Sequence, residues 1–262
     1  MNDILQIIAD NKRRELMDRY PIEYFNGPQD ISHLTLPPIH SMKNSLQSVK
    51  GGIIAEFKRR SPSKGEISPM ADVKKIVDQY YSCGAAAFSI LTDTRFFGGS
   101  NYDLAVAKKI AGKIPVLRKE FIVSKVQIKE ARLLGADAIL LIATLLSKEE
   151  LETFNIYAHS LGLEVLVEIH DLKELDKLTF LPDMLGINNR NLSSFHTDVS
   201  RSFDLISYLP KECVLVAESG IKSPKDIKKL RDAGFTGFLI GEAFMATPNP
   251  GETLKRFIDE SF

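Results

Sequence analysis

Hydrophobic residues recur along this chain in two alternating patterns from Gly51 onward. Short apolar runs predict buried strands over residues 53–57, 86–91, 115–118, 138–142, 164–169, 184–188, 214–217 and 237–240. Amphipathic stretches between them predict helices over residues 71–83, 103–111, 124–134, 148–161, 172–178, 201–209 and 224–233. Four of these helices are followed by a glycine that suits a left-handed C-terminal cap, namely Gly84, Gly135, Gly162 and Gly234.

This regular alternation predicts an α/β protein. Eight apolar strands joined by helical crossovers imply a parallel sheet whose outer face is covered by helices. Such a sheet closes into a (β/α)8 TIM barrel. A doubly wound open sheet is the alternative, but it usually has fewer strands and often a glycine-rich turn after the first. The chain contains no G-x-G-x-x-G motif, which favours the closed barrel.

The segment before the barrel has a different pattern. Its apolar residues Ile4, Leu5, Ile7 and Ile8 fit one face of a helix, and a second short helix is expected near residues 41–50. A segment of this length makes a poor independent core. We therefore predict an N-terminal helical extension (residues 1–50) packed on the barrel (residues 51–262), as a single domain overall.

The composition excludes several classes of partner. Hydrophobic residues make up 44% and charged residues 26% of the chain, and the formal net charge is zero. No global field therefore favours nucleic acid or a membrane, and anion binding must come from local groups. The longest apolar runs, such as residues 138–143, are too short to span a bilayer. The N-terminus lacks a signal-peptide pattern, so the cytoplasm is the expected location.

Metal binding is not expected. Cys83 and Cys213 are far apart in sequence, and the five histidines show no close metal-ligand spacing. Buried thiols that act as small apolar residues are the favoured interpretation of the cysteines.

Charged and polar side chains gather where the predicted strands end. Glu56 and Lys58 fall on the same face of the first strand, because strand side chains alternate. The ends of other strands carry Lys119, Glu168, Asn188, Glu218 and Glu242. In a barrel these ends meet at one mouth, where the chemistry of this fold takes place. Buried charges are costly unless paired or used, so the alternatives are an active site and a rim of mutually satisfied ion pairs.

Two glycine turns follow the last two predicted strands. Ser219-Gly220 and Gly241-Glu242 each stand between a strand and a helix. Backbone N–H groups at such helix starts bind phosphate, and barrels commonly hold phosphate after these strands. The two turns together predict a phosphate site.

Longer motifs at these positions resemble the indole-3-glycerol-phosphate synthase family. The resemblance begins with AEFKRRSPSKG at residues 55–65. It continues in the family's order with SILTD (89–93), FFGGS (96–100), LRKEFI (117–122), LVEIH (166–170), LGINNRNL (185–192), AESGI (217–221) and LIGEA (239–243). Glu120 and Phe244 stand where the family usually has Asp and Leu, and both keep the chemical type.

The resemblance implies a carboxy-lyase of tryptophan biosynthesis that needs no cofactor. The family converts 1-(2-carboxyphenylamino)-1-deoxyribulose 5-phosphate to indole-3-glycerol phosphate and releases carbon dioxide and water. By resemblance Lys119 is the general acid for attack on the carbonyl, and Lys58 is a second acid that helps the hydroxyl leave. Glu168 is then the base, and Glu56 positions a lysine and the substrate.

The resemblance also implies a binding site around these residues. Asn188 and Glu218 match residues that contact substrate hydroxyls or hold the lysines. The other matches are Phe97, Phe121, Leu140 and Leu192 for the aromatic ring, Arg190 for the carboxylate, and Ser61, Ser219, Gly220, Gly241 and Glu242 for the phosphate. At Glu242 only the backbone N–H suits a phosphate, and Leu140 fits a plain barrel core equally well. Lysines and carboxylates so close together should shift each other's pKa values.

Other functions remain as alternatives. A different phosphosugar barrel, such as phosphoribosylanthranilate isomerase, is expected to carry a cysteine near the end of the first strand, where Glu56 stands. A non-catalytic phosphometabolite-binding barrel would keep the phosphate site and lose the interior lysines and glutamates. His170 has two interpretations, a proton shuttle and a structural hydrogen bond, and the second is favoured. Contact with other tryptophan-pathway enzymes is left open.

Overall fold

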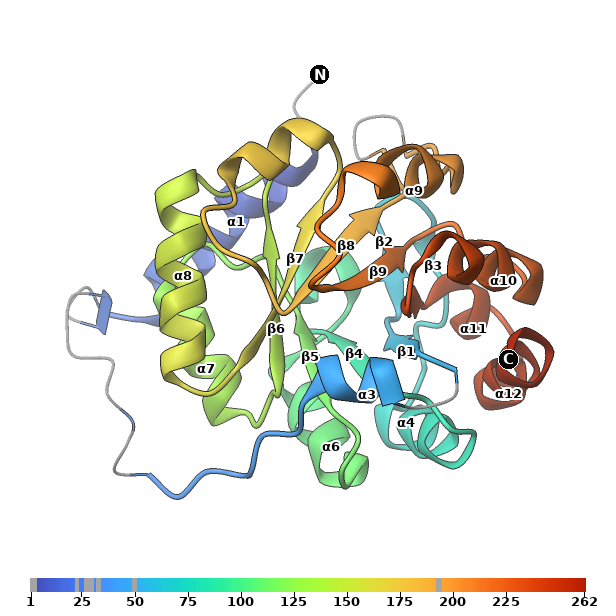
Figure 1. Ribbon diagram of the computed structural model, residues 1–262. Helices are drawn as coiled ribbons and strands as arrows, with labels where there is room; N and C mark the ends of the chain where they lie inside the picture. The colour runs from blue at the N-terminus through green and yellow to red at the C-terminus, as the bar shows by residue number, and fades with distance from the viewer. Residues whose placement is uncertain (1–3, 22–23, 26–30, 32–33, 49–50, 192–194) are drawn as a thin grey trace.

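The computed structural model describes residues 4–21, 24–25, 31, 34–48, 51–191 and 195–262. Its central strands are β1 (Ile53–Phe57), β4 (Ala87–Leu91), β5 (Val116–Lys119), β6 (Ala138–Ile142), β7 (Glu164–Ile169), β8 (Met184–Asn188), β9 (Val214–Glu218) and β10 (Gly237–Ile240). They are all parallel to their neighbours, and β1 closes the barrel by pairing with both β4 and β10. The closed barrel is therefore confirmed, and the open sheet is excluded (Figure 1).

Helices surround the barrel on its outer face (Figure 1). They are α4 (Val73–Ser82), α6 (Asn101–Ala111), α7 (Lys125–Leu133), α8 (Lys148–Ser160), η1 (Leu172–Lys177), α9 (Ser200–Leu205), η2 (Ile206–Tyr208), α10 (Pro224–Ala233) and α12 (Pro250–Ser261). Shorter elements lie in the loops, namely the hairpin of β2 (Arg60–Ser61) and β3 (Gly65–Glu66), and the helices α5 (Thr94–Phe97) and α11 (Glu242–Met245). The extension contributes α1 (Ile4–Arg19) and α3 (Met42–Ser48).

Two predicted helices differ in type from the expectation. Residues 172–177 form a 3₁₀ helix, and residues 200–208 change from α-helix to 3₁₀ after Leu205. Both segments are short, and 3₁₀ geometry is common in pieces of this length. The cap glycines behave as predicted, since Gly84, Gly135, Gly162 and Gly234 all have positive φ angles.

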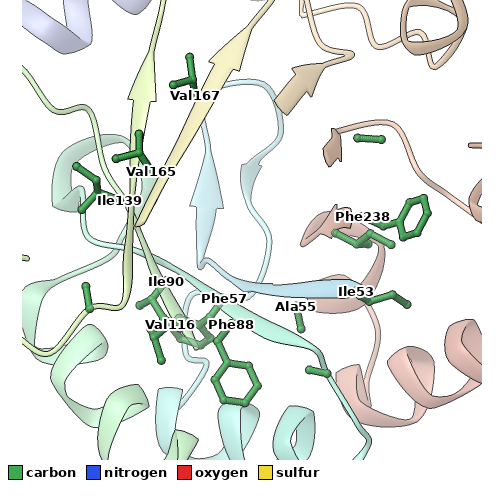
Figure 2. Packing of buried hydrophobic residues seen from close by; sticks show 14 of the residues in the cluster. Ile53, Ala55, Phe57, Phe88, Ile90, Val116, Ile139, Val165, Val167 and Phe238 are labelled. Atoms are coloured by element: carbon green, nitrogen blue, oxygen red, sulfur yellow. The ribbon is translucent and has the colours of Figure 1, made fainter. Parts of the chain in front are cut away.

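The barrel core has two apolar layers that follow the alternation of side chains along each strand. Ile53, Ala55 and Phe57 of β1 belong to the layer between strands and helices (Figure 2). Ile54 belongs to the second layer, inside the barrel, with Leu117 and other strand residues. Glu56 alternates with the outward residues and therefore faces the barrel interior. The part of the interior nearer the amino ends of the strands is thus apolar, and the charged groups lie nearer the carboxyl ends.

Helix α1 is attached to the barrel by both apolar and ionic contacts. Leu5 and Ile8 belong to the inner apolar cluster. The buried Lys12 ammonium lies 3.0 Å from a carboxylate oxygen of Asp93 and 3.4 Å from one of Glu120. Both carboxylates are buried, so Lys12 neutralises charges on the loops after β4 and β5. The division at residue 50 stays a prediction.

Replacing Lys12 with Met should destabilise the protein strongly. The change leaves the carboxylates of Asp93 and Glu120 buried without this cation, and breaking a buried ion pair typically costs about 3–5 kcal/mol. Urea unfolding of K12M and wild type measures the difference. K12R keeps the charge and is the control, so its free energy of unfolding should fall much less. An equal decrease in the two variants would contradict the ionic role of Lys12.

Candidate active site

The carboxyl ends of the strands open into a cavity of about 730 Å³. Its wall contains all the predicted site residues that the structure describes, which are Glu56, Lys58, Ser61, Phe97, Lys119, Phe121, Leu140, Glu168, Asn188, Arg190, Glu218, Ser219, Gly220, Gly241 and Glu242. Leu192 lies outside the described residues. The barrel thus brings together residues that are up to 186 positions apart in sequence, Glu56 and Glu242 being the extremes.

The Lys119 ammonium at the end of β5 is the centre of the polar network. It donates to Oε2 of Glu168 at 2.8 Å and to Oε2 of Glu218 at 2.7 Å. Asn188 donates from Nδ2 to the other oxygen of Glu168 at 3.1 Å. Glu168 and Glu218 are almost fully buried, so one lysine is held between two carboxylates that come from β7 and β9.

Burial and charge act on these groups in opposite directions. Burial alone would lower the pKa of Lys119, but the charges of Glu168 and Glu218 outweigh it and raise that pKa, so the ammonium stays protonated. Burial would raise the pKa of Glu168, yet Lys119 outweighs it and lowers that pKa. At Glu218 burial dominates, and with the repulsion of Glu168 it raises the pKa to about 8. The trio therefore holds one ammonium, one carboxylate and one protonated carboxyl near neutral pH.

A second ion pair lies on β1 and the loop after it. Lys58 donates from Nζ to Oε1 of Glu56 at 2.7 Å, and Ser89 donates to the other oxygen of Glu56 at 3.5 Å. Of the two lysines that Glu56 is expected to position, the structure shows it in contact with Lys58, and its charge also helps to raise the pKa of Lys119. A Cβ atom at Gly241 would lie 2.4 Å from Oε1 of Glu56, so only glycine leaves room for this carboxylate.

Glycine makes room for Glu218 as well. A Cβ atom at Gly186 in β8 would lie 2.2 Å from Oε1 of Glu218. Two of the interior carboxylates therefore depend on a glycine in a neighbouring strand or loop. Gly241 is therefore needed to make room for Glu56, whether or not it also binds a phosphate.

Apolar side chains form one wall of the cavity beside Lys119. The rings of Phe97 and Phe121 lie with their centroids 5.7 Å apart, and Leu140 lines the same cavity. Ile8 of α1 also lines it. Asp93 accepts from the N–H of Phe96 and Glu120 accepts from the N–H of Phe121, so the two Lys12-bound carboxylates also fix the aromatic loops.

Another part of the cavity, formed by the loops after β8, β9 and β10, is suited to an anion. Ser219 and Gly220 both have positive φ angles, a conformation that is uncommon for serine and is found at functional sites. Arg190 donates to Oε2 of Glu242 at 3.1 Å and also to Ser63. Lys64, at the turn of the β2–β3 hairpin, lies 3.3 Å from Oε1 of Glu242.

Sequence reasoning missed Lys12, Lys64 and Arg59. Lys12 continues the helical spacing of Leu5 and Ile8 and therefore falls on the apolar face of the helix. A lysine at such a position is the one sign in the sequence that its charge is buried and paired. Arg59 makes two hydrogen bonds to the buried Asp103, at 2.7 and 2.9 Å, and holds the start of the hairpin. The contacts of Lys64 leave no pattern in the sequence.

His170 has the structural hydrogen bond that the sequence favoured. Its Nδ1 lies 3.1 Å from the hydroxyl oxygen of Thr144, and its Nε2 lies 3.5 Å from Oε1 of Glu168. Its charge, when present, helps to lower the pKa of Glu168. The structure describes no group of His, Cys, Asp or Glu side chains with the arrangement of a metal site. None of the described helices is long and apolar enough to cross a membrane.

Solved structures of other proteins share the fold. A thiamine phosphate pyrophosphorylase from Pyrococcus furiosus superposes with a TM-score of 0.62 at 14% identity, covering 85% of this chain and 100% of that one. An N-acetylmannosamine-6-phosphate 2-epimerase from Clostridium perfringens gives a TM-score of 0.58 at 18% identity, covering 80% of this chain and 93% of its own. At these identities the likeness supports the barrel fold alone.

Sequence relatives are much more similar. The family model for indole-3-glycerol phosphate synthase matches residues 5–257. The indole-3-glycerol phosphate synthase of Bacteroides thetaiotaomicron is 50% identical over 98% of both chains. The enzyme of the same name from Bacillus cereus is 44% identical over 94% of both chains, and that from Acidithiobacillus ferrooxidans is 41% identical over 97% of this chain and 98% of its own. The chain belongs to the indole-3-glycerol phosphate synthase family.

Proposed function

We propose that this protein closes the indole ring of indole-3-glycerol phosphate, with the residues of the cavity in the roles derived below. The substrate is 1-(2-carboxyphenylamino)-1-deoxyribulose 5-phosphate, and carbon dioxide and water are released. The observation that carries the proposal is the Lys119 ammonium, held by two buried carboxylates beside an apolar wall and facing a cavity that also contains Lys58.

Lys119 acts as the acid in the first step. Attack of the aromatic ring on the ribulose carbonyl carbon puts negative charge on the carbonyl oxygen. The ammonium has three N–H donors, and two of them bind Glu168 and Glu218, so the third can donate to that oxygen. A positioned acid contributes about 10²- to 10⁴-fold in rate.

The apolar wall and Arg190 hold the aromatic end of the substrate. Phe97 and Phe121 lie against each other, and with Leu140 they line an apolar wall on which a ring can pack. The guanidinium of Arg190 suits the ring carboxylate until it leaves as carbon dioxide. Loss of the carboxylate then restores the aromatic ring.

Dehydration needs an acid and a base on the new ring. Lys58, oriented by Glu56, protonates the hydroxyl that leaves as water. Glu168 is ionised because its pKa is lowered, and it removes the proton from the ring carbon. Glu168 lies next to Lys119 and can return this proton to it, which restores the first acid.

The phosphate end of the substrate belongs at the turns after β9 and β10. Ser61, Ser219, Gly220 and Gly241 line this part of the cavity and offer hydroxyl and backbone N–H donors. Glu242 can contribute only its backbone N–H. A cytoplasmic location and contacts with other tryptophan-pathway enzymes stay predictions.

Pure protein mixed with the carboxyphenylamino-deoxyribulose phosphate should produce indole fluorescence. The alternative isomerase reaction would give no indole product. Absence of signal while substrate binding is detected by calorimetry would refute the proposed function.

Lys119→Met should abolish turnover and leave substrate binding largely intact. The variant removes the acid but keeps the aromatic wall and the anion end of the cavity. Measurements of kcat and of substrate affinity separate the two effects. Near-normal kcat would remove Lys119 from the first step.

Glu168→Gln should lower kcat by about two to four orders of magnitude, the usual contribution of a positioned base. The glutamine keeps the size of the side chain and its hydrogen bond to Asn188. Single-turnover kinetics reports this chemical step without interference from product release. A rate within a factor of two of wild type would exclude Glu168 as the base.

The protonated carboxyl of Glu218 gives a pH-dependent signal. Because its pKa is raised, its proton should persist above the pH at which ordinary glutamates ionise and be lost as the pH rises through about 8. Infrared titration of the carboxylic acid band, compared with the same titration of E218Q, measures it. If the carboxylic acid bands of wild type and E218Q no longer differ once the pH has risen to 5, the raised pKa of Glu218 is contradicted.

A further inference from the structure

The side chain of Glu242 places a negative charge in the wall that is expected to bind an anion. It is ionised, because the effect of burial on its pKa is outweighed by Arg190 and Lys64, which lower that pKa. Its two oxygens lie 3.1 Å from the guanidinium of Arg190 and 3.3 Å from the ammonium of Lys64. A carboxylate beside a phosphate is repulsive, so the presence of Glu242 requires an explanation.

The two partners of Glu242 are among the cations in the cavity wall, which also include Lys58 and Lys222. Arg190 and Lys64 come from the loop after β8 and from the β2–β3 hairpin, and both line the cavity. Arg190 also donates to Ser63 in the same hairpin. Glu242, in the first position of α11, joins these two segments through charge.

We propose that Glu242 is an internal competitor of the ligand, whose anionic groups must compete with it for Arg190 and Lys64. This inference rests on the proposed function, since it concerns how that site binds its phosphorylated substrate and product. A ligand either shares the two cations with Glu242 or displaces it, and in both cases it approaches the Glu242 charge. Glu242 therefore lowers affinity for phosphate-bearing molecules.

The chemistry of the reaction gives a reason for a lower affinity for phosphate. The product keeps the phosphate group of the substrate, so a site that binds phosphate very tightly would release its product slowly. The carboxylate of the substrate, in contrast, is lost during the reaction. Lower affinity for phosphate shortens the lifetime of the product complex.

Calorimetric titration with inorganic phosphate tests the proposal without any turnover. Glu242→Gln keeps the size of the side chain and removes its charge, and it should bind phosphate about three- to tenfold more tightly than wild type. The difference should shrink as ionic strength rises, because these pairs are partly exposed. Glu242→Asp keeps the charge and should remain close to wild type.

Glu252→Gln is the matched control for net charge. Glu252 is exposed in the first turn of α12 and does not line the cavity, so its substitution should leave phosphate affinity unchanged. Equal or weaker phosphate binding by E242Q, or equal tightening by E242D or E252Q, would overturn the proposal. Tighter phosphate binding by E242Q together with absence of indole product in the wild type would refute the proposed function alone.

Discussion

The structure depends on one ammonium group placed between two buried carboxylates. Lys119, Glu168 and Glu218 come from β5, β7 and β9, which are alternate strands of the barrel, so their side chains project into its interior at the same level. Two ionised carboxylates could not share this space without a cation. With one cation, the low-energy arrangement keeps one carboxyl protonated, and the opposite pKa shifts of Glu168 and Glu218 express this. The same constraint supplies a base and an acid in one small volume.

The barrel makes space for these charges by leaving side chains out. Gly186 and Gly241 each stand where a Cβ atom would collide with an interior carboxylate. Below the charged groups, the interior is filled by apolar side chains such as Ile54, Leu117 and Leu166. The strand alternation that packs Ile53, Ala55 and Phe57 against the helices also turns Glu56 inward. Stability and chemistry therefore use alternate residues of the same strand.

Much of this could be predicted from sequence because it depends on periodicity. The ends of β1, β6, β7, β8 and β10 agree with the predicted strand boundaries, and the polar residues that follow the strands meet at one mouth. Contacts between segments leave no such pattern. The contact of Lys64 with Glu242 depends on how a short hairpin folds back, and the burial of Lys12 depends on how α1 lies on two loops. The direction of the Lys119 pKa shift was equally hidden, because it is set by the number of carboxylates within reach rather than by the residue itself.

The pairing of cations has a consequence for recognition. Lys58, Lys119 and Arg190 line the same cavity, and each is bound to a carboxylate of the protein. Pairing reduces the cost of holding these cations in a partly buried wall, and it fixes their positions before the ligand arrives. An anionic ligand then binds cations that already have a carboxylate partner, so it forms no ion pair from free ions. Under the proposed function, we therefore infer that charge adds modestly to affinity and that the apolar wall of Phe97 and Phe121 provides a large share of the binding free energy for the aromatic end. In this proposal, charge in the cavity acts mainly on the reacting groups, where a preorganised ammonium or carboxylate changes the rate.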